Sequence, residues 1–125
     1  MLGKNSEIIK NFMEDVFNAH DLSKLDEYMR DDYMQHNPTA EDGKEGFKKF
    51  ATKFFTLKPH MEIVKMFEND NNEVAVFFKC TCEANGSINK VCDIYRLEDG
   101  KLAEHWDVVE HDVGGIKPVN GRSLF

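Results

Sequence analysis

Hydrophobic and polar positions follow two periods along this chain, a helical one in the first half and an alternating one in the second. Between about residues 6 and 20, apolar side chains recur three and four positions apart, at Ile8, Ile9, Phe12, Met13, Val16 and Phe17. Residues with this spacing share one face of an α-helix. The pattern therefore predicts an amphipathic helix, with Asn5 or Ser6 as its N-cap.

Two shorter helical patterns follow before the period changes. Asp21 is expected to cap a helix whose buried side carries Leu22, Leu25 and Met29. Pro38 disfavours helical backbone at the residue before it, so residues 33–36 should be extended and the chain should turn at Asn37. A third helix is expected to end before Pro59 and to bury Phe47, Phe50, Ala51 and Phe54.

From residue 60 onward the pattern is typical of strands. Residues 60–67 and 73–84 are separated by an Asn-Asp-Asn-Asn turn, and the second run places on one face Val74, Val76, Phe78, Cys80 and Cys82. Asn85-Gly86 is a hairpin signal that leads into the next strand. The order of elements indicates the α+β class, with three N-terminal helices packed on a curved antiparallel sheet that leaves a concavity.

The last predicted hairpin, residues 91–113, carries the densest set of chemically active side chains in the chain. Val, Ile, Tyr and Trp alternate there with Asp, Arg, Glu and His, which is the pattern of a half-buried strand pair. If residues 99–100 form a two-residue loop, Asp93 lies opposite Trp106. In that register Asp107 falls on the face opposite to that of Asp93.

A three-residue loop at residues 98–100 gives a different register. With Gly100 in the left-handed conformation as a bulge, Asp93 lies opposite His105. We take this register as the working interpretation because it gathers ionisable and apolar groups on one face: Val91, Asp93, Tyr95, Ala103, His105, Asp107 and Val109.

Length and charge narrow the possible partners. At 125 residues the chain is expected to form a single domain, residues 1–125, with a core of its own. The net charge of −7 and the scattered Lys and Arg residues argue against a nucleic-acid surface. No apolar run is long enough to cross a bilayer, so no membrane partner is expected.

The cysteines indicate a compartment and argue against a zinc site. Cys80, Cys82 and Cys92 are an odd number with no signal peptide before them, which predicts reduced thiols in a cytoplasmic protein. A Cys-x-Cys pair without a matching second pair is weak zinc spacing, and small buried hydrophobes are the simpler explanation. We therefore expect no metal and no cofactor.

Two segments carry a family resemblance. The order of elements, the segment YMQHNP at residues 33–38 and the segment DIYRLEDGKLAEHWDV at residues 93–108 resemble the SnoaL-like polyketide cyclase family. That family belongs to the nuclear transport factor 2-like (cystatin-like) superfamily, which also includes ketosteroid isomerase and scytalone dehydratase. The resemblance covers nearly the whole chain. It implies one SnoaL-like domain with a cone-shaped fold, metal-free acid–base chemistry in a pocket, and a dimer.

The resemblance also implies roles for individual residues. Asp107 matches the catalytic carboxylate on the last strand of SnoaL-type cyclases. Asp93 matches the protonated, oxyanion-stabilising aspartate of ketosteroid isomerase, where the cyclases carry histidine. Asn37 occupies the position of the isomerase's general base, but an amide cannot accept a proton. This departure leaves Asp107 or His36 as the candidate base.

Each candidate also has a plainer interpretation. Asp107 and Asp93 could be strand carboxylates that face solvent or pair with basic residues, and His36 could be a hydrogen-bonded edge residue. Catalysis at Asp107 requires partial burial, because a carboxylate removed from water becomes a stronger base. His105 is either a pocket residue or a partner for a carboxylate. The predicted substrate contacts are Asn37, His105, Tyr95, Tyr33 and Phe17.

Together these features predict a small-molecule enzyme that uses acid–base catalysis on an apolar carbonyl substrate. Aldol-type cyclisation, isomerisation and dehydration all fit. The alternative is a ligand-binding or dimerisation module on the same fold, which Asn37 in place of a base favours. In the working register Ile94, Trp106 and Val108 lie on the face opposite the pocket, so we expect a homodimer built on that face.

Overall fold

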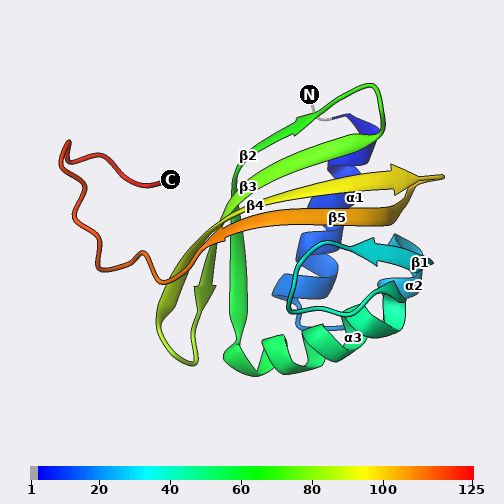
Figure 1. Ribbon diagram of the computed structural model, residues 1–125, viewed down its shortest axis with the longest axis horizontal. Helices are drawn as coiled ribbons and strands as arrows, with labels where there is room; N and C mark the ends of the chain where they lie inside the picture. The colour runs from blue at the N-terminus through cyan, green and yellow to red at the C-terminus, as the bar shows by residue number, and fades with distance from the viewer. Residues whose placement is uncertain (1–2) are drawn as a thin grey trace.

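A strongly bent sheet curls around three helices that lie together on one side of it (Figure 1). The computed structural model describes residues 3–125. The strands are arranged in the order β1-β5-β4-β3-β2. Their bounds are β1 Met29–Gln35, β2 Pro59–Glu68, β3 Glu73–Cys82, β4 Ser87–Glu98 and β5 Lys101–Glu110. The predicted α+β class is confirmed.

The sheet is mixed, whereas an antiparallel sheet was predicted. Strands β2 to β5 form an antiparallel meander, but β1 pairs with β5 in the parallel direction. The short segment at residues 33–36 shows that the chain is extended there. It does not show whether its neighbour in the sheet is parallel or antiparallel. That neighbour is β5, which follows some seventy positions later, after α3 and three strands.

The first predicted helix is present and amphipathic, but the expected cap at Asn5 or Ser6 is wrong, because the helix begins at Lys4 with Gly3 as its N-cap. It consists of α1, Lys4–Phe12, followed by a wider π-helical segment η1, Met13–Asn18. The wider turn brings Asn18 to the edge strand β2. The Asn18 amide donates to the Met61 carbonyl at 3.0 Å and accepts from the Met61 N–H at 2.7 Å. This side chain therefore satisfies backbone groups that an edge strand leaves unpaired.

The second predicted helix is only one turn long. α2 spans Leu25–Tyr28, and Met29 already begins β1. The expected cap at Asp21 is wrong, because the residue before the helix is Lys24. Asp21 instead accepts hydrogen bonds from the Ser23 N–H at 2.8 Å and the Ser23 hydroxyl at 3.0 Å, which closes a local turn ahead of the helix.

The remaining helix and the alternating strand agree with the sequence pattern. α3 spans Gly43–Phe54, and a 3₁₀ turn at Phe55–Leu57 leads into β2. Along β3 the predicted inward positions are all buried: Val74, Val76, Phe78, Cys80 and Cys82. The segment after residue 113 is irregular. Within residues 3–125, no helix has the length and apolar character needed to span a bilayer. The predicted cytoplasmic location stays a prediction.

The β4–β5 hairpin differs from both registers considered from the sequence. Glu98 pairs with Lys101, so the loop has two residues, Asp99 and Gly100, with φ of 52° and 79°. Left-handed backbone at both positions is typical of a type I′ turn, and positive φ at Gly100 was predicted. The register then shifts by one residue at Ala103, which has no partner on β4.

This bulge at Ala103 decides which residues share a face. Beyond it, Asp93 pairs with Asp107 and Tyr95 pairs with His105, so the expected pairing of Asp93 with His105 is wrong. A one-residue slip exchanges the two faces of a strand. The two-residue loop alone would have sent Asp107 to the outer face. The bulge returns it to the same face as Asp93 and His105.

Candidate active site

A cavity of about 500 Å³ lies between the concave face of the sheet and the helices. Several aromatic residues line it: Phe17, Tyr33, Phe47, Phe54, Phe78 and Tyr95. Such a concave and mostly apolar space with a few convergent polar groups is typical of a small-molecule site.

The polar groups converge on one part of the cavity wall. One ligand atom each from Asp93, His105 and Asp107 lie within 4.8 Å of one another. Asp93 and His105 are buried, with 5% and 7% of their surface exposed, and Asp107 is half-buried. The two carboxylates face each other directly across β4 and β5. Like charges directly opposite each other on neighbouring strands repel.

Tyr95 holds the Asp93 carboxylate from within the sheet. Its hydroxyl donates to Asp93 Oδ2 at 2.8 Å. Burial, and then the negative charge of Asp93, raise the pKa of Tyr95 well above its usual value. The same two causes raise the pKa of Tyr33 well above its usual value. Both phenols therefore keep their protons at neutral pH and can act as hydrogen-bond donors.

His105 presents one ring nitrogen without a partner. Its Nδ1 lies 2.6 Å from Gln35 Oε1, which also accepts the Asn37 N–H at 3.1 Å. Since this amide oxygen is an acceptor, we assign the ring proton to Nδ1. Nε2 lies 3.2 Å from Asp93 Oδ1 but not in hydrogen-bond geometry, and among the described residues it is the buried side-chain polar atom left without a partner.

Asn37 orients the second carboxylate. Its Nδ2 donates to Asp107 Oδ2 at 2.6 Å. The Asn37 Oδ1 accepts from the Thr39 N–H at 2.8 Å and the Thr39 hydroxyl at 2.5 Å. These two bonds fix which end of the amide faces Asp107. The Asn37 amide thus serves as a donor to a neighbouring carboxylate.

His36 does not line the cavity, contrary to its prediction as a candidate base. Its Nε2 lies 2.7 Å from Glu104 Oε2, and its ring stacks on Trp106 at 4.8 Å between centroids. Strand alternation explains the correction. Tyr33, Gln35 and Asn37 line the cavity, so His36 between them points outward.

The structure places the other predicted site residues on the cavity wall: Phe17, Tyr33, Asn37, Asp93, Tyr95, His105 and Asp107. Gln35 was missed by sequence reasoning, although the alternation that places Tyr33 and Asn37 inward includes it. Four further polar lining residues were also missed, because they lie around the β3–β4 turn and just after β5: Asn85, Ser87, His111 and Asp112.

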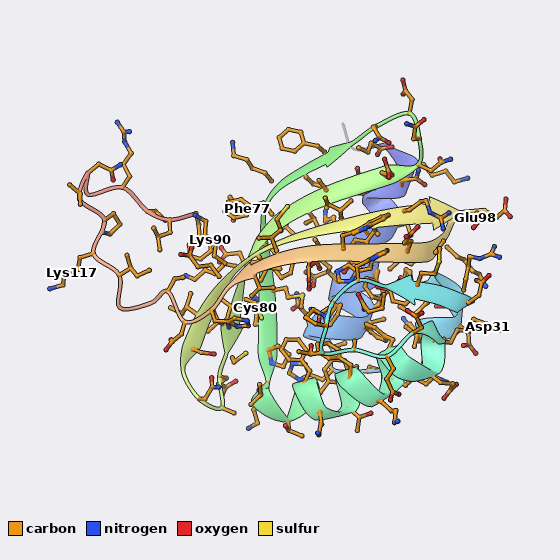
Figure 2. All side chains as sticks on the ribbon, viewed as in Figure 1. Asp31, Phe77, Cys80, Lys90, Glu98 and Lys117 are labelled. Atoms are coloured by element: carbon orange, nitrogen blue, oxygen red, sulfur yellow. The ribbon has the colours of Figure 1, made fainter. Side chains whose placement is uncertain are left out.

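The cysteines of the cavity wall are poor metal ligands. Cys80 and Cys82 both line the cavity, and Cys80 points to the opposite side of β3 from Phe77 (Figure 2). Burial, and then the neighbouring Cys82, raise the pKa of Cys80 to about 12. A thiol must lose its proton to bind zinc well. Within residues 3–125, the group with spacing suited to an ion is Asp93, His105 and Asp107.

Comparisons with known proteins identify the family and the fold. The model of the SnoaL-like domain matches residues 9–105. No curated protein matches the chain.

Solved structures match nearly the whole chain. A candidate polyketide cyclase from Acidithiobacillus ferrooxidans has a TM-score of 0.76 and 17% identity, with 88% of this chain and 90% of that chain covered. IdmH, a candidate polyketide cyclase from Streptomyces antibioticus, has a TM-score of 0.74 and 20% identity, covering 86% and 93%. An NTF2-like protein of unknown function from Cytophaga hutchinsonii has a TM-score of 0.70 and 16% identity, covering 88% and 92%. At these identities the likeness shows the fold.

Proposed function

Because this chain belongs to the SnoaL-like domain family, we propose that it is a small-molecule enzyme that moves protons on an apolar carbonyl compound held in the cavity. One observation carries the proposal: two buried or half-buried carboxylates face each other at the polar part of an aromatic cavity, each held by its own partner. A carboxylate that is held in one orientation beside an apolar ligand site is placed to act as a general base.

Asp107 is the proposed general base. Asn37 donates a hydrogen bond to Asp107 Oδ2, while Asp107 Oδ1 accepts no hydrogen bond from the described residues. One oxygen is therefore held in place and the other is free for a substrate proton. Asp107 is also the less buried of the two carboxylates, so a ligand in the cavity can reach it. This is the arrangement that proton abstraction next to a carbonyl needs.

Tyr33 is the proposed donor to the carbonyl oxygen. The Tyr33 phenol retains its proton for the reasons given above. Donors at a developing enolate oxygen stabilise it strongly in a site that excludes water.

Aldol-type cyclisation, isomerisation and dehydration can share this first step. In each, Asp107 takes a proton from the carbon next to the carbonyl while a donor stabilises the oxygen. The candidate polyketide cyclases of the same fold favour cyclisation as the class to test first. The fold alone does not choose among the three.

The test is deuterium exchange at the carbon next to a carbonyl. 2-Tetralone, an apolar ketone, is incubated with the protein in D₂O and followed by proton NMR. The proposal predicts exchange well above the buffer rate, saturable in ketone. The rival, a binding module, predicts that the ketone binds without faster exchange. Asn37 in place of a carboxylate is the observation that favours the rival.

A further inference from the structure

We propose that the polar part of the cavity recognises a protonated amine, so that the natural ligand carries an organic ammonium group on an apolar body. This deepens the proposed function and rests on the same cavity, but it concerns binding and does not depend on turnover. It is based on which polar atoms of Asp93, His105 and Asp107 have a hydrogen-bond partner in the chain and which do not.

Each of these three residues has one polar atom held by a partner from the chain. His105 Nδ1 donates to Gln35 Oε1. Tyr95 donates to Asp93 Oδ2, and Asn37 donates to Asp107 Oδ2. The second atom of each is uncommitted: His105 Nε2, Asp93 Oδ1 and Asp107 Oδ1. With the ring proton on Nδ1, all three of these atoms are acceptors.

The cavity contains no fixed positive charge to match them. No Lys or Arg from residues 3–125 lines it, whereas Asp93, Asp107 and Asp112 do. A cleft lined by one sign of charge concentrates ions of the opposite sign. The buried and unpartnered His105 Nε2 adds a free-energy cost that an N–H donor from a ligand would remove.

An ammonium group matches this set in number. It offers three N–H donors, one for each of the three acceptors. The three residues bring one ligand atom each within 4.8 Å of one another, and Asp93 Oδ1 and His105 Nε2 are 3.2 Å apart. Aromatic rings of Phe17, Tyr33 and Tyr95 line the same cavity, where they can stabilise a cation.

A bare divalent ion fits the cavity less well. Ligands at about 2.0–2.2 Å from a zinc ion lie roughly 3.4 Å apart. Although Asp93 Oδ1 and His105 Nε2 are 3.2 Å apart, an ion would leave the rest of a cavity of about 500 Å³ without an occupant. An organic ammonium ion fills both parts, with its charge at the three acceptors and its body against the aromatic walls.

The test is a matched series of ligands that share one apolar body. 2-Naphthylmethylamine, 2-naphthylmethanol and 2-naphthoate are titrated by calorimetry at neutral pH in the presence of EDTA. The amine should bind at least tenfold more tightly than the alcohol, and the naphthoate more weakly than the alcohol. D107N should reduce affinity for the amine to the level of the alcohol without weakening the alcohol, which also verifies that the variant is folded.

D70N is the matched control, since it removes one negative charge from an exposed turn remote from the cavity wall. It should leave all three affinities unchanged. The proposal is overturned if the amine has no advantage over the alcohol, whether all three ligands bind equally or none binds. One-to-one binding of Zn²⁺ that D107N abolishes, with no preference for the amine, would also overturn it. No ligand in the series has an exchangeable α-carbon proton next to a ketone, so failure here leaves the exchange test independent.

Discussion

The two faces of the β4–β5 pair carry similar residue types in opposite electrostatic settings. On the outer face Glu104 accepts from Arg96 at 3.0 Å and from His36 at 2.7 Å. On the inner face Asp93 and Asp107 oppose each other without Lys or Arg on the described cavity wall. The outer carboxylate is paired with basic side chains, and these pairs help to hold the strands together. The inner carboxylates have no such partners, so some of their oxygen atoms are available to bind a ligand.

The largest expected effect is on proton transfer at the inner face. D107N should slow the exchange of 2-tetralone by about 10²- to 10⁴-fold, because that is the usual contribution of a positioned general base. E104Q, at an outer-face position of the same strand, should exchange at close to the wild-type rate. Equal losses in the two variants would show that the distinction between the faces is wrong.

The outer face is proposed to have a function of its own, as a dimer interface. Phe67, Ile94 and Val108 are 68%, 38% and 74% exposed there, beside the half-buried Trp106. V108D should weaken self-association by roughly 2 kcal/mol, about thirtyfold, because it places a charge in an apolar contact. V119D, in the exposed tail, is the control and should change nothing.

Sedimentation at micromolar concentration measures this association. A wild-type protein that sediments as a monomer would contradict the dimer. The cavity proposals would be unaffected, since they depend on residues of one chain.

Two neighbouring residues of β4 allow the faces to be compared by stability. Y95F removes the inner hydrogen bond to the buried Asp93 and should cost about 1–3 kcal/mol, because a buried acceptor loses its donor. R96A removes outer ion pairs that are partly exposed and should cost at most about 1 kcal/mol. Urea unfolding measures both. A larger loss for R96A would reverse the comparison.

The smallest expected effect is a pH dependence at Glu104. Hydrogen bonding from His36, supported by Arg96, holds the pKa of Glu104 below its usual 4.5. A lowered folded-state pKa contributes stability that is present above the unfolded value and lost as pH falls through the folded value. Urea unfolding should therefore show wild type more stable than E104Q at pH 7, with the difference shrinking as the pH falls below 4.5. A difference that stays the same as the pH is lowered would exclude this ion pair as its source.

Elements with a strong period were predictable from the sequence. The first helix and the alternation along β3 each bury a whole face, so one pattern specifies both the element and its orientation. Because alternate residues of an extended segment point to opposite faces, residues 33–37 could also have been assigned correctly, with Gln35 and Asn37 pointing inward and His36 outward. The position of His36 was missed because its chemistry was given more weight than strand alternation.

The hairpin register could not be predicted in the same way. A bulge adds one residue without a characteristic sequence, and Ala103 is an ordinary small residue in an alternating strand. The predicted face for Asp107 was right although the predicted pairing was wrong, since the three-residue loop and the bulged two-residue loop have the same parity. Pairing partners that depend on such a local irregularity need the structure.

The most direct test compares the histidines of the two faces in one experiment. Protein labelled with ¹⁵N-histidine is titrated with 2-tetralone, and the ring signals of His105 and His36 are followed by NMR. The account predicts that the His105 signals shift as the ligand saturates while those of His36 remain in place. Shifts at His36 with none at His105 would contradict the claim that the ligand binds at the inner face of the sheet.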